Sequence, residues 1–416
     1  MRRVLIATVG SHGDVHPYLA VARALVERGH EVRFAVHPHF HRAAELAGVE
    51  AVPLDAGLDY LAIVGDPRLT SPWRAPSYIV NGLLERAPGM ARETIAHAKR
   101  MGADAIFAHH ICFGTRWLAD AEGLPCAIGA LAPSVWFNPS DPAPTVQRYV
   151  GPNHARLAKL LDPAARGAAR LLANRRLRWV QRDLGVGGPP ADIIREFRTG
   201  APMLGMWSPT FRDAVPGDPE HSRICGFPWH DRAEHEAEQC TPATQAFLDA
   251  GEPPVVFTAG TSAVFTAERY FARAIDAMRA SGRRAIVLRG PGMDLPGNLP
   301  ETIHAAEYEP FSALLPRAAC VVHHGGIGTT AQALRAGVPN IVLPMSNDQF
   351  NNAIRVVNLG AGLTCHATRA TPARLGRLIE RALADEQIAA SAERIGAALR
   401  SEPDGAVVAA EVIESV

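Results

Sequence analysis

Short apolar runs alternate with helical patterns along most of this chain, and this alternation restricts the fold more than any other feature. The run Val4–Val9 is followed by a helical pattern and then by EVRFAV at residues 31–36. Similar strand-like runs, with helical patterns between them, lie at 253–260, 283–290, 320–324 and 339–344. Strands joined through helices pair in parallel. The sequence therefore predicts an α/β fold built on parallel sheets.

The length of 416 residues is sufficient for two domains. Between about 205 and 254 the sequence is polar, rich in proline and without clear periodicity, as expected where two domains are joined. We predict an N-terminal domain over 1–207, an interdomain linker over 208–235, a second domain over 236–400 and a final helical segment over 401–416.

Composition and charge exclude several classes of protein. The 42 Lys and Arg residues balance the 42 Asp and Glu residues, so the global charge gives no argument for nucleic acid or an anionic membrane. No stretch approaches the ~20 apolar residues of a membrane span, and the N-terminal apolar run is shorter than that of a secretory signal. The six cysteines are scattered without a C-x-x-C pair, which is typical of reduced thiols. We therefore expect a cytoplasmic protein.

The most informative segment is VVHHGGIGTTAQALRAG at 321–337, where a strand passes into a helix through three glycines. The first N–H groups of a helix lack partners within the helix, and glycines let an anion come close to them. The segment predicts a phosphate site formed by His324, Gly325, Gly326, Gly328 and Thr329. The spacing matches neither G-x-G-x-x-G nor G-x-x-x-x-G-K-[ST], which disfavours a dinucleotide site or a P-loop. Tight packing between strand and helix is the alternative explanation of the glycines.

Two further loops extend this phosphate site. VLPMSNDQFNNA places Asp348 and Gln349 after the next strand, and TAGTS places Gly260, Thr261 and Ser262 after the first strand of the same domain. Because the carboxyl ends of adjacent parallel strands share one crevice, these groups should lie together. A carboxylate and an amide beside a phosphate indicate a site for a nucleotide-diphosphate sugar, although Asp348 also suits a helix N-cap.

These segments carry a resemblance to a known family. HHGGIGTTAQALRAGVPNIVLPMSNDQFNNA resembles the donor-binding signature of the nucleotide-sugar-dependent glycosyltransferases of the GT-B type, which include secondary-metabolite glucosyltransferases and bacterial antibiotic glycosyltransferases. GSHGDVHPYLAVARALVERGHEVRFA is similar to the N-terminal signature of that superfamily, so the resemblance covers nearly the whole chain. GDPRL, GFPWHD and DQFNNAIRVVNLG look most like the rhamnosyltransferases of bacterial rhamnolipid synthesis.

The resemblance implies a fold and roles for individual residues. The fold would be two Rossmann-like domains facing each other across a cleft, with the acceptor on the first domain, the donor on the second and the last helix packed back on the first. Tyr308 lies where the plant enzymes have a tryptophan that stacks on the base, and Phe311 where they have a glutamine. The contacts to diphosphate, ribose and sugar would come from His324, Gln332, Asp348 and Gln349.

The loop SHGDVHP offers two candidates for the base that an inverting transfer needs. By the same resemblance, His12 matches the catalytic histidine of the plant and macrolide enzymes, and Asp14 matches the aspartate of the sterol and glycopeptide enzymes. Histidine has the better reference pKa, whereas aspartate needs burial to become a stronger base. We favour Asp14, with His12 as a necessary neighbour in either case; a carboxylate that only caps a helix is the structural alternative for Asp14.

Other polar clusters are weaker candidates. His109 and His110 lie at the end of a predicted strand and are, with Trp136, weak candidates for the acceptor site; for the two histidines we favour the alternative, an ordinary pair at a strand end. HPHFH at 37–41 has no carboxylate or cysteine at ligand spacing, and no D-x-D motif is present, so we expect no metal and no cofactor besides the nucleotide sugar.

The sequence thus predicts an inverting glycosyltransferase that moves a hexose of the rhamnose or glucose type. The donor would be a dTDP- or UDP-sugar, and the acceptor a hydroxyl of a small lipophilic molecule, either a hydroxy-fatty-acid lipid or an aromatic or polyketide metabolite. The alternatives are a sugar-nucleotide epimerase or hydrolase of the same fold and a catalytically silent auxiliary subunit.

Overall fold

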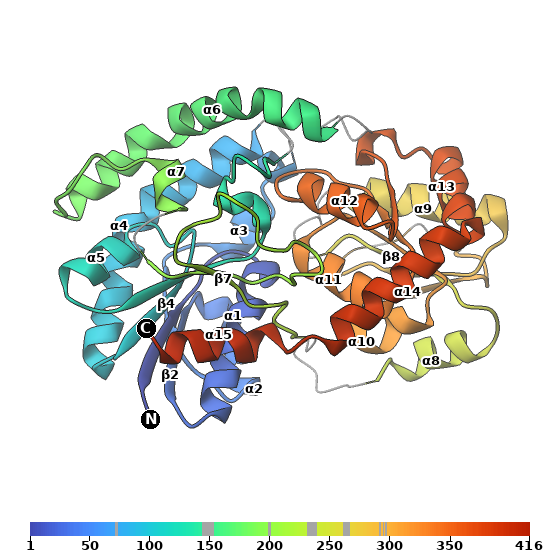
Figure 1. The fold of residues 1–416 in the computed structure, drawn as a ribbon. Coiled ribbons are helices and arrows are strands. Elements are labelled where there is room, and N and C mark those ends of the chain that lie inside the picture. The colour runs from blue at the N-terminus through green and yellow to red at the C-terminus, as the bar shows by residue number, and fades with distance from the viewer. Residues whose placement is uncertain are drawn as a thin grey trace.

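The computed structural model describes residues 1–70, 74–143, 154–198, 201–230, 239–260, 267–290, 293, 295 and 298–416. Within these ranges the chain forms two domains, each built on one parallel sheet (Figure 1). This confirms the predicted α/β class with two Rossmann-like halves. The N-terminal domain is drawn in blue to green, and most of the second domain in yellow to red.

The first sheet has the order β3-β2-β1-β4-β5-β6-β7, and every pairing in it is parallel. Its strands are β1 (Arg3–Ala7), β2 (Glu31–Val36), β3 (Glu50–Pro53), β4 (Ala105–His109), β5 (Cys126–Ala130), β6 (Met203–Gly205) and β7 (Ser222–Ile224). Strand β7 lies inside 208–235, the range predicted to be a linker. This part of the range belongs to the first sheet, because its short strand pairs with β6.

The helices of the first domain cover both faces of this sheet. They are α1 (His12–Glu27), α2 (His41–Leu46), α3 (Tyr60–Val64), α4 (Ala75–Met101), α5 (Thr115–Ala121), α6 (His154–Asp183) and α7 (Ile193–Glu196). Successive residues of β1 alternate between two cores, with Leu5 and Ala7 in one and Val4 and Ile6 in the other. A strand buried on both faces explains the unbroken apolar run in the sequence.

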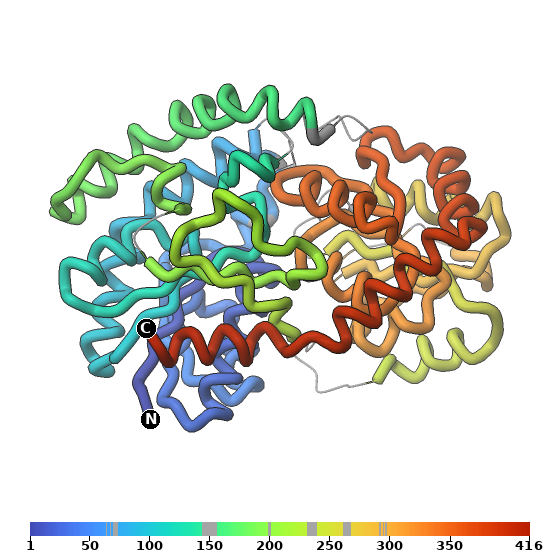
Figure 2. The backbone as a smooth tube through the Cα atoms, in the orientation of Figure 1, coloured from blue at the N-terminus to red at the C-terminus, as the bar shows by residue number. Residues whose placement is uncertain are grey.

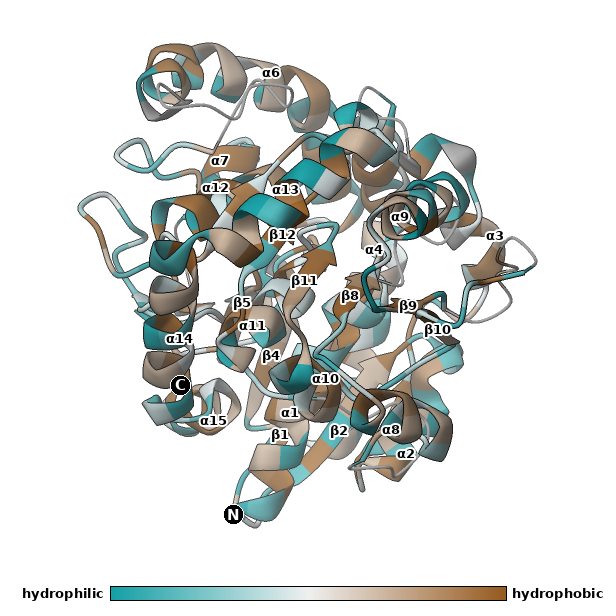
Figure 3. Cartoon of the chain, turned by 90° about the vertical axis from the view of Figure 1, so that its right-hand side faces the viewer, coloured by the Kyte–Doolittle hydropathy of each residue, from teal (hydrophilic) through white to brown (hydrophobic). Residues whose placement is uncertain are grey.

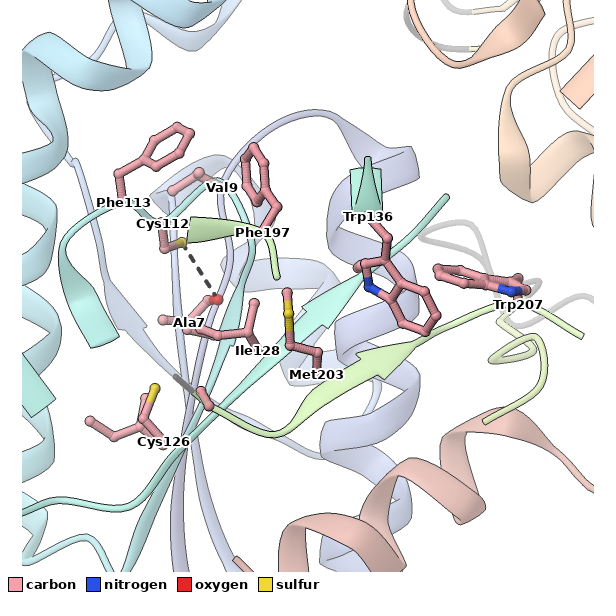
Figure 4. Packing of buried hydrophobic residues seen from close by; sticks show 14 of the residues in the cluster. Ala7, Val9, Cys112, Phe113, Cys126, Ile128, Trp136, Phe197, Met203 and Trp207 are labelled. Atoms are coloured by element: carbon pink, nitrogen blue, oxygen red, sulfur yellow. Dashed lines mark hydrogen bonds between the residues drawn. The ribbon is translucent and has the colours of Figure 1, made fainter. Parts of the chain in front are cut away.

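One hydrophobic core of the first domain contains Trp136, which the sequence suggested for the acceptor site (Figure 4). Trp136, in the 3-10 helix Pro133–Trp136, is fully buried, and its ring centroid lies 4.5 Å from that of Trp207. A side chain on Gly205 would overlap both tryptophan rings. The prediction that Trp136 lines the acceptor site is therefore wrong, because its ring fills the core.

The second sheet has the order β10-β9-β8-β11-β12-β13, again all parallel. Its strands are β8 (Val255–Thr258), β9 (Ala285–Leu288), β10 (Ile303–Ala306), β11 (Cys320–His323), β12 (Asn340–Val342) and β13 (Gly362–Thr364). Its helices are α8 (Pro242–Asp249), α9 (Ala267–Ser281), α10 (Phe311–Leu314), α11 (Ile327–Ala336), α12 (Gln349–Asn358), α13 (Pro372–Ala384) and α14 (Glu386–Ser401). The strands at the centre are apolar, whereas exposed parts of helices such as α13 are hydrophilic (Figure 3).

The last helix, α15 (Gly405–Glu414), crosses from the second domain to the first, and both chain ends lie on the first domain (Figure 2). Ala409, Ala410 and Ile413 are buried in the same core as α1. Glu414 accepts hydrogen bonds from Arg28 at 2.6 and 2.8 Å. The two domains are thus joined twice, by the segment after β7 and by the segment between α14 and α15.

No helix among the described residues is long and apolar enough to cross a membrane.

Candidate functional site

The polar residues predicted for donor binding follow the carboxyl ends of strands in the second sheet. Gly260 follows β8, Tyr308 follows β10, His324 follows β11, and Asp348 follows β12. Because these strands are parallel, their ends share one edge of the sheet. Strands β8, β11 and β12 are neighbours, so Gly260, His324 and Asp348 lie in adjacent loops, whereas Tyr308 follows the edge strand.

The first histidine of the pair has a structural role. His323 is fully buried; its Nδ1 accepts a hydrogen bond from the Gly325 amide at 3.2 Å, and its Nε2 lies 3.1 Å from Asn340 Oδ1. These two partners require a neutral ring that carries its proton on Nε2. Burial agrees with this assignment, because it lowers the pKa of His323 to about 4. His323 therefore holds the start of the glycine-rich loop against β12.

His324 is placed differently, with its ring between two glycines. A side chain on Gly260 or Gly326 would overlap the ring, so both positions require glycine. His324 Nδ1 is buried and has no hydrogen-bond partner among the described residues. Burial, followed by the influence of His323, lowers the pKa of His324 to about 3, so the ring is neutral at physiological pH. A neutral imidazole still offers one N–H donor to a phosphate oxygen.

The helix that follows, α11, begins without a cap of its own. Gly326 is its N-cap residue and makes no side-chain cap hydrogen bond, and the first turn contains no acidic residue. Gly328 is exposed, and a side chain there would meet only open space. The exposed end of the helix, with its free N–H groups, therefore suits an anion.

Asp348 is the N-cap residue of α12, yet its carboxylate makes no cap hydrogen bond. Instead, Asp348 Oδ2 accepts a hydrogen bond of 2.8 Å from Asn352 Nδ2, which also donates to the carbonyl of Gly325 at 2.9 Å. Asn352 thus ties the Asp348 carboxylate to the glycine-rich loop. We did not predict this residue from the sequence; its only signal is a position four residues after Asp348, on the same face of the helix.

Gln349 closes its own loop. Its side-chain oxygen accepts hydrogen bonds from the amides of Met345 at 2.9 Å and Ser346 at 3.2 Å. Both acceptor positions of this oxygen are therefore occupied, and the side-chain NH₂ group is the part of Gln349 that can donate a hydrogen bond to a ligand.

At the start of α1, the first domain supplies its own carboxylate. Asp14 Oδ2 accepts hydrogen bonds from the Ser11 amide at 2.7 Å and from the Ser11 hydroxyl at 3.0 Å, and the bond from the amide belongs to a capping box. Gly10 has φ +117°, and a side chain there would overlap Asp14. Burial raises the pKa of Asp14, although the bonds from Ser11 and the charge of His110 oppose the shift. Asp14 therefore caps the helix and is also made more basic.

The two carboxylates influence each other across the domain boundary. Burial raises the pKa of Asp348 to about 6; the bond from Asn352 opposes this shift, and the charge of Asp14 adds to it. Burial is the main cause that raises the pKa of Tyr60, and the charge of Asp14 adds to this shift. Burial lowers the pKa of His110, and the charge of Asp14 opposes this shift. Asp14 thus lies within electrostatic reach of α12 of the other domain.

His12 belongs to a cluster of rings beside this site. Its centroid lies 5.0 Å from Phe40, 5.4 Å from His16 and 5.8 Å from His39. His16 in turn lies 4.9 Å from His230, in the segment that joins the domains. Although the cluster is rich in histidine, the described residues contain no group of three His, Cys, Asp or Glu side chains that could hold a metal ion.

The remaining predicted residues lie in varied places. Gln332 is buried on α11, Phe311 is half-buried at the start of α10, and Tyr308 is exposed. Thr329 is half-buried in the first turn of α11. Thr261 and Ser262 lie outside the described residues.

The two histidines at the end of β4, His109 inside the strand and His110 just after it, also differ from each other. His109 is almost fully buried, with Nδ1 3.3 Å from the carbonyl of Val9, and burial lowers its pKa to about 3. It therefore does not line an open site. His110 is half-buried and acts electrostatically on Asp14, so it is the better placed of the pair.

An ion pair holds the two domains in register close to this site. Asp141, in the first domain, accepts hydrogen bonds from Arg355 Nη2 on α12 at 2.6 Å and from Arg212 Nε at 3.0 Å. Helix α12 begins directly after Asp348, so the pair connects the carboxylate of the second domain to the first domain. This contact joins positions more than 200 residues apart, and we did not predict it from the sequence.

Comparisons with known proteins identify the family of this chain. Residues 4–133 match the N-terminal domain of glycosyltransferase family 28, and residues 285–415 match the C-terminal domain of erythromycin biosynthesis protein CIII-like proteins. Among curated relatives, the chain is 30% identical to Glycosyltransferase GtfE of Amycolatopsis orientalis, over 99% of this chain and 97% of that protein. It is 29% identical to O-mycaminosyltylonolide 6-deoxyallosyltransferase of Streptomyces fradiae, over 96% and 94% of the two chains.

Solved structures show the same fold. The kitacinnamycin glycosyltransferase superposes with a TM-score of 0.76 at 24% identity, over 100% of this chain and 98% of the other. The calicheamicin glycosyltransferase gives 0.74 at 18% identity, over 100% and 98%. With relatives of 30% identity over nearly their full length, two matched domains and the GT-B architecture, this chain belongs to the GT-B glycosyltransferases of the GT1 type and is a glycosyltransferase enzyme.

Proposed function

We propose that the enzyme transfers a hexose of the rhamnose or glucose type, with inversion, from a dTDP- or UDP-sugar to a hydroxyl of a small lipophilic acceptor. The observation that carries this proposal is the pair of carboxylates on either side of the domain boundary. Asp14 of the first domain is close enough to Asp348 of the second to raise its pKa. Asn352 connects Asp348 to the glycine-rich loop at the start of α11.

In the proposed reaction the diphosphate binds at the start of α11, where free N–H groups and the neutral His324 ring donate hydrogen bonds to its oxygens. Asp348 accepts hydrogen bonds from the sugar hydroxyls, and the side-chain NH₂ group of Gln349 donates to them. These contacts present the anomeric carbon to the first domain. The arrangement neutralises the diphosphate without a metal ion, and we propose that none is needed.

Asp14 is the proposed general base. One of its oxygens is held by Ser11, which fixes the carboxylate, and burial makes it more basic. It takes the proton of the acceptor hydroxyl while the oxygen attacks the anomeric carbon. The bond between that carbon and the diphosphate oxygen breaks, and the nucleoside diphosphate leaves with the bonding electrons. His12, packed among His16, His39 and Phe40, shapes the acceptor side of Asp14.

The names of relatives support the type of donor and acceptor. One relative at 30% identity is a vancomycin aglycone glucosyltransferase, and another at 26% is a sterol 3-beta-glucosyltransferase. Two structural neighbours are complexes with thymidine diphosphate. The first two names give an aglycone and a sterol as acceptors of a glucosyl group, and the other two give thymidine diphosphate as a bound nucleotide, which supports the proposed classes of acceptor and donor. The rhamnosyl preference rests on sequence resemblance alone.

The proposal is tested by incubating the enzyme with dTDP-rhamnose, UDP-glucose and related sugars and measuring release of nucleoside diphosphate. Release that depends on a lipophilic acceptor, and that continues in EDTA, is the expected result. Release or isomerisation without an acceptor would instead identify a hydrolase or epimerase. If the protein neither binds nor turns over any nucleotide sugar, it is a silent subunit. Loss of activity in EDTA, restored by a divalent cation, would contradict the metal-free site.

A further inference from the structure

Helix α6 carries a concentration of positive charge on the outside of the first domain (Figures 1 and 2). Over residues 154–183 it has seven arginines and one lysine against two aspartates, although the whole chain is neutral. This excess is local, and global charge did not reveal it. A charge run on a helix is most often a solvated face.

The inner side of α6 packs against the first domain. Ala158, Ala173, Leu177 and Val180 are buried, and the helix lies along α4. The opposite side is formed by residues spaced three or four apart, which share one face of a helix. We call this face the α6 stripe, and it consists of Leu160, Ala164, Gly167, Leu171, Arg175, Arg178 and Arg182.

The first half of the α6 stripe is apolar and exposed. Leu160 is 75% exposed and Leu171 is 87% exposed, although leucine is usually buried. Beside the stripe, Leu172 and Trp179 are exposed at 37% and 41%. Four large apolar side chains on one helix are more than the single exposed residues expected on an ordinary surface.

The second half of the stripe is cationic, and none of its three arginines forms an ion pair within the described part of the chain. Beside the stripe, Arg170 pairs with Asp192, and Arg178 of the stripe donates to the carbonyl of Ala191. Arg175, Arg176 and Arg182, by contrast, form no ion pair and no side-chain hydrogen bond within the described part of the chain. A shallow depression beside the stripe is lined by Arg170, Arg175, Arg178 and Arg182 together with Asp192. Free guanidinium groups around a depression suit the phosphate of a lipid headgroup.

We propose that the α6 stripe docks the enzyme on an anionic lipid surface. Leucine and tryptophan would enter the boundary between headgroups and acyl chains, while the arginines pair with lipid phosphates; this combination is the mark of a helix that lies in a membrane interface. A second copy of the chain is a poorer occupant, because two such stripes would bring like charges together. The proposal extends beyond the transfer reaction and does not depend on which acceptor is used.

The test is cosedimentation of the full chain with vesicles of phosphatidylcholine alone and with phosphatidylglycerol added. We expect binding only to the anionic vesicles, weakened by high salt because exposed charges are screened. The triple variant Arg175→Glu, Arg178→Glu, Arg182→Glu should reduce the bound fraction by more than about tenfold. The matched control reverses three exposed arginines of the second domain, Arg374→Glu, Arg377→Glu and Arg394→Glu, and should keep binding close to wild type.

A second variant, Leu160→Ser with Leu171→Ser, keeps the charge and removes the apolar part. It should also weaken vesicle binding, with the melting temperature and glycosyl transfer in detergent unchanged. Full binding by this variant would overturn the proposal in favour of a purely electrostatic partner such as an acidic protein. No binding of wild type to anionic vesicles, or equal loss in the control, would overturn it as well. The proposal would also be overturned if the wild type formed concentration-dependent dimers in the absence of vesicles and the triple variant did not.

Discussion

The starts of α1 and α11 can be compared directly, because each helix follows a central strand of a parallel sheet through a glycine-containing loop. In each, the first N–H groups lack partners within the helix. At α1 the chain supplies its own anion: Asp14 accepts two hydrogen bonds from Ser11 and closes a capping box. At α11 the N-cap is Gly326, with no side-chain cap and no acidic residue in the first turn. The first start is satisfied internally, and the second is left open for an anion from outside.

The contrast shows how similar local folds acquire different chemistry. A carboxylate fixed by a cap and buried becomes a better base, which is what the acceptor side of the reaction requires. In the proposed reaction, free helix N–H groups beside a neutral histidine bind the leaving diphosphate. Substitutions at the two helix starts should therefore affect different steps of the reaction.

The largest effect is expected for Asp14→Asn. Asparagine can still cap α1, but it does not accept a proton, so kcat should fall by about a hundredfold or more while the melting temperature changes little. The paired variant Ser11→Ala should do the reverse, costing about 1 kcal/mol of unfolding free energy with a smaller loss of kcat. Turnover close to wild type in Asp14→Asn would assign the base to His12, and His12→Ala would then be the inactive variant.

At the other helix start, His324→Ala should lower kcat/KM for the donor by about tenfold to a hundredfold, because a donor to a charged oxygen is lost. Gly326→Ala should have a similar effect, since its side chain would displace the same ring. The neighbouring His323→Ala is the control and should mainly lower the melting temperature, because His323 holds Gly325 and Asn340. If His324→Ala lowers the melting temperature as His323→Ala does while kcat/KM for the donor stays close to wild type, the glycines serve packing alone.

Asp348 links the two helix starts and gives a pH dependence. Its folded pKa of about 6 lies above its ordinary value of 3.8, so its contribution to stability is present below pH 3.8 and is lost as the pH rises through 6. Asp348→Asn should therefore stabilise the protein by about 1–3 kcal/mol at pH 7.5 and have little effect near pH 3.5. Melting curves across this range, compared with donor KM, measure how much stability is given up for sugar binding.

The same pair of carboxylates predicts a shift in titration. The charge of Asp14 is one of the causes that raise the pKa of Asp348, so Asp14→Asn should move that pKa downward. NMR titration of labelled carboxyl groups would show the shift. An unchanged pKa would mean that the two groups are too far apart to share one reaction site.

The smallest effect is expected at the tether between the domains. Asp141→Asn removes the charge that holds Arg355 on α12, and we expect kcat/KM to fall by less than about tenfold, because the second link through α15 is intact. Glu380→Gln removes the exposed pair of Glu380 with Arg283 within the second domain and should leave kcat/KM unchanged. Equal effects of both variants would show that the tether does not position the two helix starts.

Much of the fold could be read from the sequence because its signals are local. The apolar run of β1, the glycines after β11 and the periodic apolar positions of the helices each depend on a few consecutive residues. The segment 222–224 misled us, because a three-residue strand in polar sequence has no pattern of its own and forms only by pairing with β6. Trp136 misled us for a similar reason: an aromatic residue in a loop shows its burial only when Trp207 and Gly205 close around it.

The sequence by itself determined which groups can do the chemistry: a carboxylate in SHGDVHP, a histidine and glycines in HHGGIG, and an aspartate in NDQ. Only the tertiary structure decided how they act together. Burial sets the pKa values of Asp14 and Asp348, Asn352 joins two loops that are remote in sequence, and the ion pair of Asp141 with Arg355 aligns two domains. Desolvation and electrostatic coupling depend on distances in space, and a linear pattern carries no information about those distances until the chain has folded.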